Sequence, residues 1–76
     1  MSESKDDRIK LARVEFLHAE REPGAGLGRQ TNVLEGERWE LYLDTWSSWV
    51  FVREHGGASK AWTIYSPASV RRVVAR

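Results

Sequence analysis

Apolar and polar residues alternate with a period of two over much of the chain, which is the pattern of half-buried β-strands. The clearest run covers residues 39–44, where Trp39, Leu41 and Leu43 alternate with charged residues and a tyrosine. Three further β-prone runs, bounded by glycine, proline or small polar residues, cover residues 31–35, 49–52 and 60–65. Because short turns separate these runs, the sequence predicts an antiparallel sheet built from hairpins.

The segment 9–20 fits two descriptions. Ser4 has capping-box spacing to an acidic residue, which would begin a helix. On a helix, however, the apolar residues of this segment point to different sides and form no stripe. On a strand, Val14 and Phe16 share one face, and a bulge near Leu11 absorbs a change of phase. The pattern favours a strand and leaves the helix as the alternative.

The C-terminal segment carries signals that begin a helix. Ser66 is a suitable N-cap, and Pro67 suits the first helical position, where its missing N–H costs nothing. Val70, Val73 and Val74 then recur at helical spacing and form an apolar stripe. We therefore expect a short C-terminal helix packed against one face of the sheet.

Together these elements predict an α+β fold that is mainly β, with a small antiparallel sheet of roughly 4–5 strands and one short C-terminal helix. The chain has 76 residues, and we expect a single domain over residues 9–76 after a flexible tail of residues 1–8. It has no cysteine, no apolar run of membrane-spanning length and no hydrophobic leader at its start. These features predict a cytoplasmic protein without disulfides, thiolate metal sites or a membrane partner.

No motif in the chain supports catalysis. The run Gly24–Gly28 lacks the glycine spacing and the following helix of a dinucleotide-binding loop, so it predicts a flexible loop. Ser47 and His55 would lie at opposite ends of one hairpin strand, about 20 Å apart, which excludes a hydrolytic triad. The two histidines are far apart in the sequence and lack metal-ligand spacing. We therefore expect a protein that is not an enzyme, with no catalytic residue, cofactor or metal.

All four tryptophans lie between Trp39 and Trp62. Strand alternation places Trp39, Trp49 and Trp62 in the core, since a small domain needs bulky side chains to bury enough area. Trp46 differs because it lies in a polar turn after the run 39–44. It is either a lid over an open end of the core or a residue presented to a partner.

Charge is nearly balanced, with a formal net charge of +1, but it is unevenly distributed along the chain. Beyond Gly56 there are four basic residues and no acid. Such a segment suits phosphates or an acidic protein surface, although it is equally typical of a solvated face. Tryptophan, tyrosine and arginine are also the most common residues at interaction hot spots. The candidate partner-binding residues are Tyr42, Trp46, Arg53, Tyr65, Arg71 and Arg72.

These residues predict a small protein-binding domain that occupies the surface of another protein or of a nucleoprotein complex. In general character, and through no specific residue, the chain resembles the small stand-alone proteins of phages and mobile elements, anti-CRISPR inhibitors among them. That resemblance implies an inhibitor or adaptor that blocks a larger assembly. The alternative is a single-stranded nucleic-acid-binding domain, although acids on the same strands count against it. A homodimer through a sheet edge is compatible with both.

Overall fold

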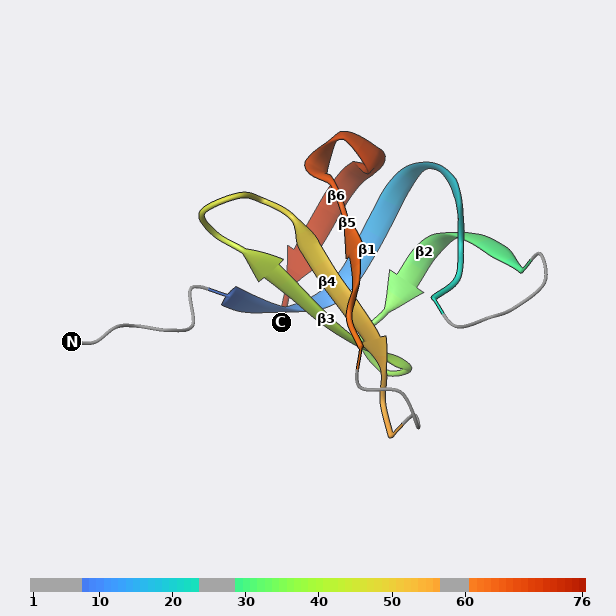
Figure 1. The fold of residues 1–76 in the computed structure, drawn as a ribbon, viewed down its shortest axis with the longest axis horizontal. Coiled ribbons are helices and arrows are strands. Elements are labelled where there is room, and N and C mark those ends of the chain that lie inside the picture. The colour runs from blue at the N-terminus through green and yellow to red at the C-terminus, as the bar shows by residue number, and fades with distance from the viewer. Residues whose placement is uncertain (1–7, 24–28, 57–60) are drawn as a thin grey trace.

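The computed structural model describes residues 8–23, 29–56 and 61–76 (Figure 1). The predictions for the N-terminal tail with its capping box, for the loop Gly24–Gly28 and for Lys60 at the start of the last run lie outside these residues. The described residues form six strands and one 3-10 turn: β1 (Arg8–Arg21), β2 (Gln30–Glu35), β3 (Trp39–Asp44), β4 (Val50–Glu54), β5 (Thr63–Tyr65), η1 (Pro67–Ser69) and β6 (Val70–Ala75).

The strands form one antiparallel sheet in the order β2-β1-β3-β4-β5, with β6 paired to β1 as well. β1 has three partners: β3 along residues 8–10, β2 between residues 13 and 21, and β6 between residues 11 and 16. Because β2 and β6 overlap along β1, they occupy opposite edges of it. The long β1 bends between these partners, and the sheet curls into a half-barrel (Figure 1). The predicted antiparallel sheet is therefore present, but it has six strands among the described residues instead of four or five.

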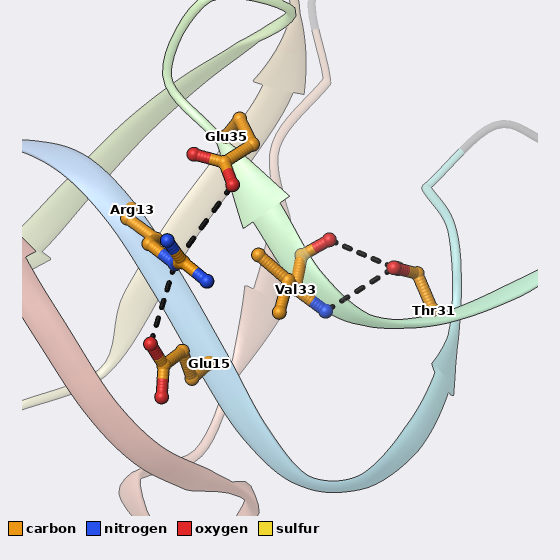
Figure 2. Close-up of polar contacts among 5 residues, drawn as sticks. All are labelled: Arg13, Glu15, Thr31, Val33 and Glu35. Atoms are coloured by element: carbon orange, nitrogen blue, oxygen red, sulfur yellow. Dashed lines mark hydrogen bonds and ion pairs between the residues drawn. The ribbon is translucent and has the colours of Figure 1, made fainter.

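Polar side chains of β1 and β2 interact on either side of the point where the pairing of the two strands is interrupted. The register shifts after Glu15, so part of the ladder is missing there. Beside the shift, the Thr31 hydroxyl donates to the Val33 carbonyl at 2.8 Å and accepts from the Val33 N–H at 3.1 Å (Figure 2). The Nε of Arg13 lies 3.2 Å from Glu15 and 3.8 Å from Glu35, which bridges the two strands. The Thr31 hydroxyl thus satisfies backbone groups beside the interruption, and the Arg13–Glu35 ion pair joins the two strands.

The core lies on the inner side of the curled sheet. Its buried residues come from five strands: Leu11, Val14, Phe16, Leu34, Trp39, Leu41, Val50, Val52 and Tyr65. Leu43, Val70 and Val73 are partly buried against this cluster. Because every strand adds only a few apolar side chains, no single hairpin has a core of its own, and the fold depends on pairing between distant segments.

The predicted C-terminal helix is wrong. The predicted N-cap is present, since the Ser66 hydroxyl accepts a hydrogen bond from the Ala68 N–H at 3.0 Å. The result is a single 3-10 turn, and at Val70 the backbone is already extended, with φ −102° and ψ 130°. β6 then pairs with β1 and places Val73 opposite Val14. Valine favours strands, and pairing with β1 stabilises this segment more than a lone short helix would. The described part of the chain is accordingly a β fold and not α+β.

The other strand predictions are largely confirmed. The segment 9–20 lies within β1, and the bulge expected near Leu11 is present as a register shift against β6. The runs 31–35 and 39–44 correspond to β2 and β3. β5 is shorter than its predicted run and begins at Thr63.

The predicted core placement of the tryptophans is correct for one of three. Trp39 is buried, at 3% exposure. Trp49 is 42% exposed, because it precedes β4 and the alternation within that strand directs Val50 and Val52 inward. Trp62 comes before β5 and is only half-buried. The predictions for Trp49 and Trp62 are therefore wrong, since both side chains lie at the surface and not in the core.

Candidate interaction surfaces

The outer face of the sheet, opposite the core, carries a cluster of aromatic and arginine side chains. We call it the aromatic face, and its members are Arg8, Tyr42, Phe51, Arg53 and Trp62. Strand alternation produces it: Leu41 of β3 and Val52 of β4 point into the core, so their neighbours Tyr42 and Phe51 point outward. Tyr42 and Phe51 are also direct partners in the β3–β4 ladder.

The three rings of the aromatic face contact one another edge to face. The Trp62 ring centroid lies 5.7 Å from that of Tyr42 and 6.2 Å from that of Phe51, with interplanar angles of 83° and 87°. This geometry directs the positive edge of one ring at the negative face of another. All three side chains are half-buried, so the cluster is packed and still accessible.

Two guanidinium groups stack on these rings. Arg8 lies 4.1 Å from the Phe51 centroid and 5.6 Å from that of Trp62, and Arg53 lies 4.1 Å from the Trp62 centroid. Each such contact contributes roughly 0.5–1 kcal/mol at an exposed site. Arg53 also donates from Nε to Glu40 at 3.1 Å. The arginines are therefore held in place by contacts within the domain.

A shallow cavity of about 200 Å³ opens within this cluster, lined by Arg8, Arg53, Tyr42 and Trp62. Glu40 offsets the charge of Arg53 at its edge. Arg8 makes no ion pair among the described residues. Its charge does act on Asp44, its partner in the β1–β3 ladder, where, after the hydrogen bond from Ser47, it helps to lower the pKa of that carboxyl. The cavity thus combines aromatic walls with a net positive charge, which suits an anionic group on an apolar surface.

Trp46 lies in the turn between β3 and β4 and is 82% exposed, which leaves little of its side chain to cover the core. Asp44 organises this turn, since its carboxylate accepts from the Ser47 hydroxyl at 2.7 Å and from the Trp46 N–H at 3.4 Å. These hydrogen bonds, that of Ser47 first, hold the pKa of Asp44 below its ordinary value. Ser48 adopts a left-handed conformation with φ 65° to complete the turn.

The structure separates the predicted partner-binding residues. Tyr42 and Arg53 belong to the aromatic face. Trp46 lies in the β3–β4 turn, and Arg71 and Arg72 are exposed on β6. Only Tyr42 and Arg53 therefore belong to the aromatic face.

Tyr65, the remaining predicted residue, lies in the core. It is 9% exposed, its ring centroid is 4.8 Å from that of Phe16, and its hydroxyl donates to the Arg21 carbonyl at 3.1 Å. Burial, together with the negative charges of Glu20 and Glu22, raises the pKa of Tyr65 to about 12. Its ring and its hydroxyl are therefore both engaged within the fold.

The raised pKa of Tyr65 predicts a loss of stability in alkaline solution. An exposed tyrosine ionises near pH 10, whereas the folded protein keeps this proton up to about pH 12. The unfolded state therefore releases the proton first, and the free energy of unfolding should fall between pH 10 and 12 by at most about 1.4 kcal/mol per pH unit. Urea denaturation at several pH values should show a steeper fall for the wild type than for Tyr65→Phe. Parallel curves would contradict this assignment.

Sequence reasoning did not assign Arg8, Phe51 and Trp62 to a binding site. Arg8 was expected in the flexible tail, but it begins β1. The outward direction of Phe51 follows from the strand phase once Val50 and Val52 are assigned to the core, so that signal was available. Strand alternation did not indicate the direction of the Trp62 side chain, because Trp62 lies outside the short β5.

Other kinds of site find no support among the described residues. Ser47 and His55 lie beyond opposite ends of β4, so they cannot form the triad that the sequence excluded. In the part of the chain that the structure describes, no three His, Cys, Asp or Glu side chains are grouped as metal ligands. Nor is any helix there long and apolar enough to cross a bilayer. Comparison with known proteins gives no match to a protein family, to a curated protein or to a solved structure.

Proposed function

We propose that this protein is a non-catalytic protein-binding domain that docks on a larger protein through the aromatic face. The preassembled cluster of three rings and two arginines carries this proposal. Tryptophan, tyrosine and arginine dominate interaction hot spots. Because the side chains of the aromatic face already hold one another, binding costs them little conformational entropy.

The complementary partner surface is apolar with an acidic group at its centre. The aromatic walls of the cavity supply apolar contact area, and the Arg8 guanidinium supplies a charge that can pair with a carboxylate. Glu40, beside Arg53, disfavours a second acid close by. We infer a role as an inhibitor or adaptor that occupies the surface of a larger protein or nucleoprotein complex.

Single-stranded nucleic-acid binding is the second candidate, since rings and arginines on one sheet face also suit bases and phosphates. Two observations favour a protein partner. Base stacking needs accessible ring faces, whereas guanidinium groups already stack on Phe51 and Trp62. The Glu40 carboxylate at 3.1 Å from Arg53 would also oppose a phosphate there.

Affinity capture with surface variants tests the proposal. Trp62→Ala and Arg8→Glu should each weaken partner binding about tenfold or more, because each removes a central member of the aromatic face. Leu17→Ala is the matched control, since Leu17 is an exposed apolar residue of β1, at 52% exposure, outside that face. Circular dichroism confirms that each variant is folded. Partner capture that survives both aromatic-face variants would contradict the proposed docking surface.

Tryptophan fluorescence separates the two candidate functions, because Trp62 lies within the aromatic face. We expect a flat response during titration with single-stranded oligonucleotides at low salt. Quenching that weakens steeply as salt rises would instead establish phosphate contacts and replace the protein-binding proposal.

A further inference from the structure

A second surface lies at the open mouth of the half-barrel, between β6 and the β3–β4 hairpin. A groove of about 250 Å³ opens there. Leu43, Val50 and Val73 give it an apolar floor that continues the core, and Arg71 and Arg72 lie at its rim. The described residues that line it include no acid, so the groove is apolar with a positive margin.

β6 meets this groove with its edge. The consecutive residues Val70–Val73 all line the groove. The register shift at Arg71 interrupts the alternation, so that Val70 and Val73 both pack against the core while Arg71 and Arg72 are both exposed. A space that contacts both the inward valines and the outward arginines borders the edge of the strand. Among the described strands β6 pairs with β1 alone. The backbone N–H and C=O groups along its other edge are thus open to a further strand.

We propose that this edge binds an extended acidic segment of a partner protein, which adds as a strand and fills the mouth of the half-barrel. Such a strand would lie about 4.8 Å from β6 and form main-chain hydrogen bonds with it. Its apolar residues would cover Leu43, Val50 and Val73, and its alternate acidic residues would meet Arg71 and Arg72. This surface is independent of the aromatic face and uses none of its residues.

Charge identifies the occupant of the groove. Arg71 and Arg72 are exposed at a register shift between β6 and β1, and both features protect a strand edge from indiscriminate pairing. A second copy of this chain, pairing β6 with β6, would bring two arginines from each copy together, and like charges across strands are destabilising. An acidic strand converts the same arginines into attractive contacts.

Selection from a phage-displayed library of random linear peptides tests this inference. We expect enrichment of peptides that alternate apolar with acidic residues. Their synthetic forms should bind about tenfold or more weakly to the Arg71→Glu/Arg72→Glu variant, and also to the wild type when alternate peptide amides are N-methylated. Arg21→Glu/Arg29→Glu is the matched control, because both residues are exposed and outside the groove. Peptide binding should also slow hydrogen exchange of β6 amides.

Several outcomes would overturn the inference. The first is a selection that yields no peptide or yields basic peptides. The second is a selected peptide that binds the wild type and the Arg71→Glu/Arg72→Glu variant with equal affinity. The third is a free protein that sediments as a dimer and that this variant converts to a monomer. If charge reversal unfolds the domain, the milder Arg71→Gln/Arg72→Gln variant gives the same comparison. Trp62→Ala should leave peptide binding unchanged, so failure here is distinguishable from failure of the aromatic-face proposal.

Discussion

Replacing Leu41 with alanine should lower the free energy of unfolding by about 2–5 kcal/mol. Leu41 is 0% exposed and lies in the middle of β3, opposite Val52 of β4. β3 is paired on both sides, to β1 and to β4, so the backbone cannot move inward to fill the space that the side chain leaves. A domain of this length has a total stability of roughly 4–11 kcal/mol, so one substitution removes a large share of it.

Urea denaturation followed by circular dichroism measures this effect. Leu17→Ala is the control, because it deletes the same atoms from a side chain that is 52% exposed on β1. The control should change stability by no more than about 0.5 kcal/mol. Equal losses in the two variants would contradict the assignment of Leu41 to a closely packed core.

Replacing Gly36 with alanine should destabilise the protein by about 1–3 kcal/mol. An added Cβ would lie 3.0 Å from the Leu11 carbonyl oxygen and 3.1 Å from that of Ala12, and both are backbone atoms that cannot rotate away. The Gly36 N–H also donates to the Ala12 carbonyl at 2.8 Å. This close approach fixes the corner between β2 and β3 against β1, so the substitution must displace one of the strands.

Gly56 gives a contrasting control for this prediction. It has φ +65° and nothing within 4 Å of an added Cβ, so alanine there meets backbone strain and no clash. Asparagine tolerates left-handed backbone, so Gly56→Asn should be milder than Gly56→Ala, whereas Gly36→Asn should be no milder than Gly36→Ala. Urea midpoints of the four variants provide the test. A rescue by asparagine at Gly36 would show that backbone conformation, and not contact with β1, requires that glycine.

The strands were predictable because their alternation is a local property of the sequence. Trp39, Leu41 and Leu43 alternate over β3 and could face only one core. The C-terminal segment was not predictable in this way, because Val70 and Val73 fit a helical stripe as well as a bulged strand. Pairing with β1, more than fifty residues earlier in the chain, decides between them.

The candidate site was harder to predict than the fold because its members are assembled by the sheet and not by a motif. Arg8 stacks on Phe51 only because β1 and β4 both flank β3. Tyr42 could be placed on an outer face from its strand phase, but its contact with Trp62 depends on the path of the chain before β5. Tyr65 shows the converse, since it is among the predicted partner-binding residues, whereas the fold buries its ring and its hydroxyl donates to the Arg21 carbonyl.

The pairing of β1 with β6 also shapes how the chain folds while it is being synthesised. β6 pairs with β1 between Leu11 and Phe16, and the Arg76 N–H donates to the Lys10 carbonyl at 3.1 Å, so the first and last described strands lie side by side. Until β6 has left the ribosome, one edge of β1 has no partner and Leu11 and Val14 lack part of their cover. Contacts so distant in sequence also close slowly, because loop-closure entropy must be overcome first. A nascent chain that ends before Val70 therefore exposes an unpaired strand edge and apolar side chains, which are the features that promote aggregation and chaperone binding in incompletely folded chains.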